Sequence, residues 1–391
     1  GETLGTGSLS VDLGALLFGG DGADRLDGGD GTADDPAAVD LAWGGDGDDT
    51  LDLGHGGDLV LGAFAFRLGN LAFGQGGADT ITGADGVDVF FGGAGDDTLQ
   101  TGRGADLDIA NSSGASILRL ALGDLVFGEG DDDTIDADEA DGDRADDDID
   151  LVFGGDGADT VRGFGGGRLS IGDAGDPTFE LNLGNLVFGG VGEDDITTGA
   201  GVDVLFGGDD GDTVQAGAGH DLDIAGSGGD SAFRLALGDL VFGDAGDDTL
   251  HGDDPDADRD DDDIDVVFAG DGDDTVRGYG GGLLSIGDAS DPDVELVLGN
   301  VVFGGAGEDD IATADGIDVV FGGDDRDTVA AGAGDVLEID DDFAIDLGDV
   351  VFGQGGDDTL HGDAPDPPDD AASDGIDVLF GGAGDDLVYG G

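Results

Sequence analysis

Short apolar clusters alternate with glycine- and aspartate-rich segments along the whole chain, and each cluster ends in an aromatic residue. Asp124-Leu125-Val126-Phe127 is typical of these clusters. Because side chains alternate along a strand, Val126 should point to one face of the strand, with Leu125 and Phe127 on the other. Strands that are apolar on both faces are usually covered on both sides. The pattern therefore predicts a β protein built from many short, similar strands.

The aromatic residues mark fourteen repeats. From Phe73 onward the successive intervals are 18, 36, 26, 35, 18, 36, 26, 35, 18, 31 and 28 residues. The shortest interval equals two segments of nine residues, which we interpret as one coil with two strands. Applied to the whole chain, this interval predicts an all-β fold, a parallel β-roll or β-solenoid of roughly 20 coils. The markers are Phe18, Trp43, Phe73, Phe91, Phe127, Phe153, Phe188, Phe206, Phe242, Phe268, Phe303, Phe321, Phe352 and Phe380.

Longer periods organise these repeats. The markers alternate between two sequence contexts, one ending in Leu-Gly-Asn/Asp and the other in Gly/Asp-Ile/Val-Asp, which gives seven units of about 55 residues. Two units make a super-repeat of 115 residues, as from Phe73 to Phe188 to Phe303. We expect residues 1–391 to form a single continuous solenoid. Four insertions rich in Asp, Pro and Ala should form loops along one edge of it. They span residues 28–38, 137–148, 252–263 and 362–374.

A nonapeptide of the pattern G-G-x-G-x-D-x-U-x, where U is a large aliphatic residue, follows each marker. Residues 19–27 and 44–52 are two copies. Glycine at the first, second and fourth positions permits backbone conformations that a Cβ would forbid, and it lets carbonyl groups approach a cation. Asp210 replaces the fourth-position Gly in one copy, and Asp325 does so in another. The residues after the conserved Asp, usually Asp-Thr-Leu, should point alternately outward and inward.

The sixth position of the nonapeptide predicts calcium ligands. A calcium ion takes six to eight oxygen ligands at about 2.3–2.6 Å, so turns of neighbouring coils would have to share an ion. This position is Asp in all fourteen copies: Asp24, Asp49, Asp79, Asp97, Asp133, Asp159, Asp194, Asp212, Asp248, Asp274, Asp309, Asp327, Asp358 and Asp386.

A second set of candidate ligands lies nine residues earlier, on the opposite edge of the coil. One of the two contexts always has Asp there: Asp40, Asp88, Asp150, Asp203, Asp265, Asp318 and Asp377. The other context has Ala15, Asn70, Asp124, Asn185, Asp239, Asn300 and Asp349. We therefore expect several calcium ions, with one edge suited to calcium throughout and the other only in part.

Composition narrows the classes of partner. The formal charge of -84 disfavours nucleic acid and anionic membranes, and it opposes compaction unless cations offset it. Disorder or a salt-adapted acidic coat would also explain charge alone. However, 38% of the residues are hydrophobic, and we count only eight Glu among the 95 acidic residues. The short side chain of Asp suits tight turns and hard cations. The chain has no Cys, which excludes disulfides and thiolate metal sites, and no apolar run approaches the ~18 residues of a membrane-spanning helix.

The tandem nonapeptides resemble those of the repeats-in-toxin (RTX, haemolysin-type calcium-binding) family, and the resemblance covers nearly the whole chain. It implies a right-handed parallel β-roll with Ca²⁺ between successive turns. It also implies secretion from a bacterial cell through a type I system, with folding triggered by external calcium.

No motif places a nucleophile beside a base, so we expect no enzymatic activity. Our leading hypothesis is an extracellular or cell-surface structural protein, a calcium-stabilised solenoid that assembles into a surface layer, matrix or filament. Its partners would be further copies, in head-to-tail or lateral contact, without nucleic acid and without membrane insertion. The alternative is a calcium-folding RTX module of a larger secreted adhesin, toxin or hydrolase.

Two regular columns of side chains leave further alternatives open. The aromatic markers should stack, either in the interior, under the longer strands, or against another chain. A column of threonines is compatible with binding of ice or mineral. Its members are Thr50, Thr80, Thr98, Thr134, Thr160, Thr213, Thr249, Thr275, Thr328 and Thr359.

Overall fold

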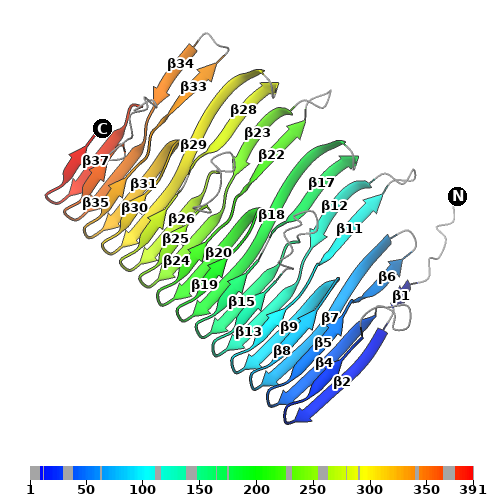
Figure 1. Ribbon diagram of the computed structural model, residues 1–391. Helices are drawn as coiled ribbons and strands as arrows, with labels where there is room; N and C mark the ends of the chain where they lie inside the picture. The colour runs from blue at the N-terminus through cyan, green and yellow to red at the C-terminus, as the bar shows by residue number, and fades with distance from the viewer. Residues whose placement is uncertain are drawn as a thin grey trace. The chain divides into compact units, whose positions relative to one another are not determined.

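The structure is a computed structural model of the chain (Figure 1). It describes residues 9–11, 13–29, 38–61, 64–110, 116–137, 148–163, 165–173, 176–225, 231–253, 263–278, 280–288, 291–339, 343–363 and 375–390. Within these ranges the chain forms strands and turns and no helix. Two compact units are present, one of residues 1–177 and 183–189 and the other of residues 178–182 and 190–391. That residues 1–391 form one continuous solenoid stays a prediction.

Each repeat contributes one long strand and one short strand. In a representative repeat, β9 (Val87–Ala94) lies in one sheet, here called sheet A, and a tight turn leads to β10 (Thr98–Gln100) in a second sheet, sheet B. The long strands of successive repeats pair in parallel, so that Phe91 lies opposite Phe73 on one side and Phe127 on the other. The short strands pair in the same way. The predicted parallel β-roll is confirmed.

The long strands carry the aromatic markers. In the first unit they are β2 (Leu13–Asp21), β4 (Val39–Asp46), β7 (Phe64–Gly76), β9, β13 (Leu125–Gly130) and β15 (Leu151–Asp156), and β18 (Asp176–Val191) is divided between the units. In the second they are β20 (Val202–Asp209), β24 (Leu240–Ala245), β26 (Val266–Asp271), β29 (Asp291–Ala306), β31 (Ile317–Asp324), β35 (Val350–Gly355) and β37 (Val378–Ala383).

The short strands follow the same order along the chain. Those of the first unit are β3 (Arg25–Asp27), β5 (Thr50–Gly54), β8 (Thr80–Gly83), β10, β14 (Thr134–Asp136) and β16 (Thr160–Arg162). Those of the second are β19 (Asp195–Thr197), β21 (Thr213–Gln215), β25 (Thr249–His251), β27 (Thr275–Arg277), β30 (Asp310–Ala312), β32 (Thr328–Ala330), β36 (Thr359–His361) and β38 (Leu387–Tyr389).

The remaining strands build antiparallel extensions of sheet A. They are β1 (Leu9–Val11), β6 (Gly57–Leu61), β11 (Ala105–Ala110), β12 (Ser116–Leu122), β17 (Gly167–Asp173), β22 (His220–Ala225), β23 (Ser231–Leu237), β28 (Gly282–Asp288), β33 (Asp335–Ile339) and β34 (Phe343–Leu347). Hairpins form between β6 and β7, β11 and β12, β22 and β23, β28 and β29, and β33 and β34.

These hairpins make the predicted count of roughly 20 coils too high. Within each unit the markers pair in register or stack with the next, seven markers lie in each unit, and sheet B has fourteen strands, so the described residues form fourteen rungs. The long intervals therefore do not contain a second coil. Between Phe206 and Phe242, for example, the additional residues form the hairpin of β22 and β23, in which Leu222 lies opposite Leu235.

The core is a narrow layer between the sheets. In β13 Val126 is fully buried, while Leu125 and Phe127 are half-buried on the outer face, as predicted. In β10 Leu99 is buried between the exposed Thr98 and Gln100. Each rung thus contributes one inward side chain from either sheet. Because this layer is thin, groups at its two edges contribute much of what is buried.

The aromatic markers stack on the outer face of sheet A and not in the interior. Phe91 and Phe127 have ring centroids 4.8 Å apart and planes 4° apart, and the other stacked pairs of each unit are similar. Contact of this column with another chain stays a prediction. The four insertions lie almost entirely outside the described residues, so their predicted placement along one edge is not addressed. Among the described residues, no helix is long and apolar enough to cross a bilayer.

Candidate metal centre

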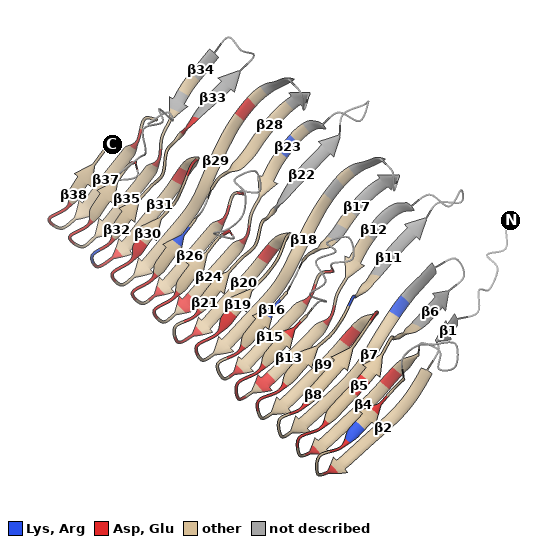
Figure 2. Ribbon diagram, viewed as in Figure 1, with Lys and Arg blue, Asp and Glu red and all other residues tan. Residues whose placement is uncertain are grey.

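The turns from sheet A to sheet B, here called the first edge, carry one aspartate from every rung. The backbone N–H of each Asp donates to Oδ1 of the Asp in the next rung, for example Asp97 to Asp133 at 2.8 Å and Asp212 to Asp248 at 2.8 Å. In the pairs from Asp24 to Asp159 and from Asp194 to Asp386 this distance is 2.7–3.1 Å. Figure 2 shows acidic residues gathered in these turns. The sixth-position aspartates therefore form a hydrogen-bonded column, the first-edge ladder.

The second carboxylate oxygen of these residues is buried without a hydrogen-bond partner among the described residues. The fourteen aspartates are mostly buried, with Asp97 and Asp133 each 2% exposed. Eleven of them have an Oδ2 of this kind: Asp24, Asp49, Asp79, Asp97, Asp133, Asp212, Asp248, Asp274, Asp309, Asp327 and Asp358. An anionic oxygen taken out of water without a partner is costly, so this row of oxygens needs a cation or protons.

Glycine at the first position leaves room beside this oxygen. A Cβ built on Gly44 would lie 2.5 Å from Oδ2 of Asp49 and 2.9 Å from the carbonyl oxygen of Gly74 in the next rung. The space that a side chain would fill thus faces one carboxylate oxygen and one carbonyl oxygen, from two different rungs. Oxygen ligands of these two kinds are those that calcium prefers.

Burial changes the ionisation of the ladder. Desolvation raises the pKa of Asp97, Asp133 and Asp212 to about 7, and nearby carboxylates add to the shift. The hydrogen bond from the preceding rung opposes this effect only in part. Near neutral pH these groups are therefore poised between a protonated state and a state in which a cation balances the charge.

The turn backbone is left-handed at the second and fourth positions. Gly45 and Gly47 have φ of 119° and 121°. Seven non-glycine residues adopt positive φ in equivalent places: Gln75, Glu129, Asp131, Asp210, Asp244, Asp325 and Gln354. The sequence analysis identified Asp210 and Asp325 and missed the other five. The turn is therefore preserved even where glycine is not, at a conformational cost.

The returns from sheet B to sheet A form the second edge, with a second ladder. The N–H of Asp88 donates to Oδ1 of Asp124 at 2.6 Å, and that of Asp239 donates to Oδ1 of Asp265 at 2.8 Å. Asp88, Asp239 and Asp349 each have a buried Oδ2 without a hydrogen-bond partner among the described residues. Burial raises the pKa of Asp349 to about 8 and those of Asp88 and Asp239 well above their usual range.

The second-edge ladder contains the predicted residues of each unit, which are Ala15, Asp40, Asn70, Asp88, Asp124, Asp150 and Asn185 in the first and Asp203, Asp239, Asp265, Asn300, Asp318, Asp349 and Asp377 in the second. Ala15 donates its N–H to Asp40 and so ends the side-chain ladder. Asn70 accepts from the N–H of Asp40 at 3.0 Å, as an Asp would. The structure thus brings together both predicted sets of residues, each along its own edge.

The comparison with protein families agrees with this arrangement. The model of the RTX calcium-binding nonapeptide repeat (4 copies) matches residues 16–32, 38–63, 73–108, 144–167, 188–223, 237–254, 303–336, 346–364 and 371–391, more than half of the chain. The chain belongs to the RTX calcium-binding repeat family. No curated protein matches it in a sequence search.

The residues at both edges fit the calcium ions that RTX repeats bind. The fit rests on buried carboxylate oxygens without partners and on the glycine cradle beside them. Among the described residues, no group of three or more His, Cys, Asp or Glu side chains could hold a metal ion. An ion would instead be shared between carboxylates of adjacent rungs and backbone carbonyl groups. When bound, calcium would neutralise the ladder and link one rung to the next.

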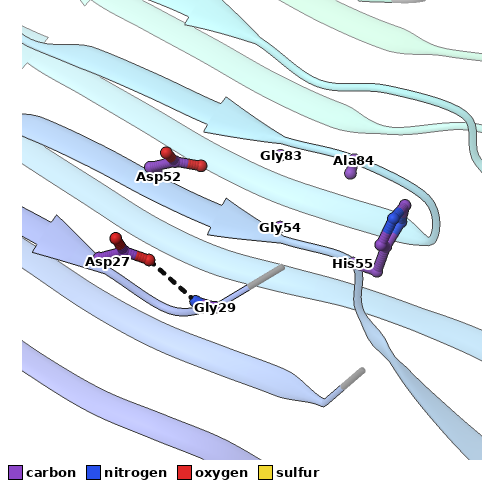
Figure 3. Close-up of a pocket in the computed structure, with 7 residues that line it drawn as sticks. All are labelled: Asp27, Gly29, Asp52, Gly54, His55, Gly83 and Ala84. Carbon is purple, nitrogen blue, oxygen red and sulfur yellow. Dashed lines mark hydrogen bonds between the residues drawn. The ribbon is translucent and has the colours of Figure 1, made fainter. Parts of the chain in front are cut away.

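A pocket of about 510 Å³ in the first unit lies at the ends of the short strands, lined by Asp27, Gly29, Asp52, Gly54, His55, Gly83 and Ala84 (Figure 3). Asp27 and Asp52 lie side by side on β3 and β5. Asp27 accepts from the N–H of Gly29 at 3.2 Å, and Asp52 pairs with Arg25 at 3.2 Å. Both carboxylates therefore already have partners, and the RTX ladders remain the better candidate site.

The threonine column lies in register on sheet B, with Thr80, Thr98 and Thr134 opposite one another. The neighbouring column on the same face is varied: Thr82, Gln100 and Asp136 stand in those three rungs. A regular array of hydroxyl groups is thus one residue wide, and this face does not add a second candidate function.

Proposed function

We propose that this chain is an extracellular structural RTX protein whose folding is driven by calcium and whose folded copies associate with one another through the aromatic column. The observation that carries the proposal is the row of buried carboxylate oxygens without partners at the first edge. These oxygens repel one another in the absence of a cation. Ions that bind only the folded state stabilise it by mass action, by about 2.7 kcal/mol per independent site at a hundredfold excess over the dissociation constant.

An extracellular setting would supply the calcium that weak sites need. Calcium sites of extracellular modules have dissociation constants of about 10⁻⁴–10⁻³ M. Sites of this strength would be filled outside a cell and largely empty inside it. The chain would then remain loose until it is exported, which agrees with its formal charge of -84.

Association is supported by the outer face of sheet A. Half-buried Leu and Val side chains lie beside the stacked markers, as Leu125 lies beside Phe127 and Leu240 beside Phe242. A contiguous apolar strip on a surface usually marks a contact site. The role that we propose is structural and requires no catalytic centre.

The test is a calcium titration of the purified chain at low ionic strength and pH 7.5, followed by circular dichroism, light scattering and electron microscopy, with reversal by EGTA. We expect β structure and ordered assemblies only with calcium. Full structure in EGTA would overturn the calcium step. A folded monomer at every concentration would overturn the assembly step and favour the alternative, a folding module of a larger secreted protein.

A matched pair of variants separates folding from assembly. Replacing Phe91, Phe127 and Phe153 by Ser should leave calcium-dependent folding in place and abolish assembly. Replacing Thr98, Thr134 and Thr160 of the same rungs by Ser changes the opposite sheet and should leave both unchanged. Assembly of the Phe variant at wild-type concentrations would contradict a contact through this column.

A further inference from the structure

Three rungs of the second edge carry asparagine in place of aspartate. Asn70, Asn185 and Asn300 are 115 residues apart, on β7, β18 and β29. Their Oδ1 atoms accept the N–H of Asp40, Asp150 and Asp265 at 3.0, 2.9 and 2.8 Å. In this respect asparagine reproduces the aspartate ladder, so the substitution preserves the fold of the edge.

The other atom of the side chain behaves differently. Nδ2 of Asn70 donates to the carbonyl oxygen of Gly54 at 2.8 Å. The same bond joins Asn185 to Gly165 at 2.7 Å and Asn300 to Gly280 at 2.8 Å. Gly54 is the last residue of the short strand β5, and Gly165 and Gly280 follow the short strands β16 and β27, so all three lie where the chain leaves sheet B. An amide nitrogen carries two hydrogens and no lone pair for a cation, and it also occupies a carbonyl oxygen that an ion would need.

Aspartates on equivalent rungs provide the contrast. Asp239 and Asp349 also lie at the base of hairpins, β22–β23 and β33–β34. They are 2% and 0% exposed, and the Oδ2 atom of each is buried without a hydrogen-bond partner among the described residues. The rungs at hairpins therefore alternate along the chain. In one kind both polar atoms of an Asn side chain are hydrogen-bonded, and in the other the Oδ2 atom of an Asp side chain has no partner among the described residues.

We propose that Asn70, Asn185 and Asn300 close their rungs to cations, so that the second edge binds calcium in separate groups of three Asp rungs. One group is Asp88, Asp124 and Asp150. Two more are Asp203, Asp239 and Asp265, and Asp318, Asp349 and Asp377. The inference rests on the proposed calcium binding. In the last group Oδ2 of Asp318 accepts a hydrogen bond from the Thr313 hydroxyl at 2.7 Å, so this rung has a partner within the chain, and an ion there would take the place of that hydrogen bond.

The asparagine rungs need no bound metal ion. Their polar atoms are satisfied by the chain alone, so these parts of the second edge are complete at any calcium concentration. In the Asp groups between them, the Oδ2 atoms of Asp88, Asp239 and Asp349 have no hydrogen-bond partner among the described residues and need a cation or a proton. Calcium would accordingly bind the first edge along each unit, and the second edge in blocks separated by metal-free rungs.

The experiment counts bound calcium by equilibrium dialysis with ⁴⁵Ca²⁺ on the full chain. Changing Asn70, Asn185 and Asn300 together to Asp should raise the number of bound ions by about three per chain, because each change restores a carboxylate oxygen and frees a carbonyl. Asn185→Asp alone should add about one ion. Gln100→Glu, at an exposed position on β10 away from the ladder, adds the same single charge and should add no ion.

The reverse change, from Asp to Asn, tests the inference in variants whose folding is checked separately by circular dichroism. Asp124, Asp239 and Asp349 changed to Asn should lower the number of bound ions by at least about three, with unchanged circular dichroism in saturating calcium. An unaltered ion count in both sets of variants, with wild type binding calcium, would overturn this inference alone. Wild type that binds no calcium would overturn the proposed function instead.

Discussion

Both edges of the RTX roll have the same hydrogen bond, from the N–H of one rung to the side-chain Oδ1 of the next. They differ in the partner of the other polar atom of that side chain. At the first edge every rung carries Asp, and the second carboxylate oxygen of most is left without a partner within the described chain. At the second edge every Asn rung places an amide nitrogen there, bonded to a glycine carbonyl group. A β-roll edge can thus be completed either by a cation or by the chain itself. Only the first solution makes folding depend on calcium.

The largest expected effect is the response of both edges to pH without metal. Burial raises the pKa of Asp97 and Asp212 to about 7 and that of Asp349 to about 8, above the value of an exposed Asp. The folded state then binds protons more tightly than the unfolded state. Stability from these protons is fully present below about pH 4 and is lost as pH rises through about 7 to 8.

We therefore expect the chain in EGTA to be ordered near pH 5 and disordered near pH 8, and calcium to restore order at pH 8. Circular dichroism and urea unfolding at each pH measure this. Calcium and protons compete for the same oxygens, so the calcium midpoint should rise as pH falls. A metal-free chain that is more stable at pH 8 than at pH 5 would contradict the account of both ladders.

The nonapeptide predicted the first edge well because local geometry dictates it. Tight turns require glycine, and the fixed Asp comes where the turn enters the strand. The second-edge set was also placed correctly from its nine-residue offset. The hydrogen bonds from the Asn side-chain amides to glycine carbonyl groups were not predicted. The acceptor carbonyl groups lie 16 and 20 residues away in sequence, so no local pattern indicates them. The recurrence of Asn every 115 residues was the available signal.

The hairpins were missed for a different reason. An alternating apolar segment such as β23 is compatible with a further coil strand or with an antiparallel extension. Its pairing with β22 decides between them, and pairing depends on contacts that interval lengths alone do not reveal. The glycine-rich segments before β6, β17 and β28 are the local sequence feature that precedes the antiparallel strands extending sheet A.

The next largest expected effect is a difference in stability between the two edges when the same Asp→Asn substitution is made in each. Asp212→Asn at the first edge and Asp239→Asn at the second both keep the oxygen that accepts the N–H of the preceding rung. A lost site costs about 2.7 kcal/mol at a hundredfold excess of calcium. At Asp239 a hydrogen bond like those of Asn185 and Asn300 should offset about 1 kcal/mol of this loss.

Urea unfolding in saturating calcium gives the two free energies. We expect Asp212→Asn to be the more destabilising. In EGTA at pH 7.5 both variants should be more ordered than wild type, because each removes a buried carboxyl group that needs a proton or a cation. Equal costs in calcium would show that the edges do not differ in the way described here.

A smaller effect tests the glycine cradle of the first edge. Gly44→Ala places a methyl group 2.5 Å from Oδ2 of Asp49 and 2.9 Å from the Gly74 carbonyl oxygen, so the turn must shift. We expect a loss of about 1–3 kcal/mol and weaker calcium binding. Gly76→Ala is the control, because its methyl group would meet no atom within 4 Å. If Gly76→Ala lost as much stability as Gly44→Ala, the space beside Oδ2 of Asp49 would not explain the requirement for glycine at position 44.

The smallest effect concerns the first-edge turns that lack glycine. Glu129 has a φ of 82° and Gln75 a φ of 85°, where a side chain costs about 1–2 kcal/mol. Replacing either by Gly relieves this strain, but the greater entropy of the unfolded chain costs about 0.5–1 kcal/mol, so we expect a net gain of up to about 1.5 kcal/mol. Gln75→Gly changes no charge, whereas Glu129→Gly removes one. Equal gains in urea unfolding would assign the effect to the backbone, while a gain for Glu129→Gly alone would assign it to repulsion among the turn carboxylates. Loss of stability in both would mean that these side chains make contacts that favour the first edge.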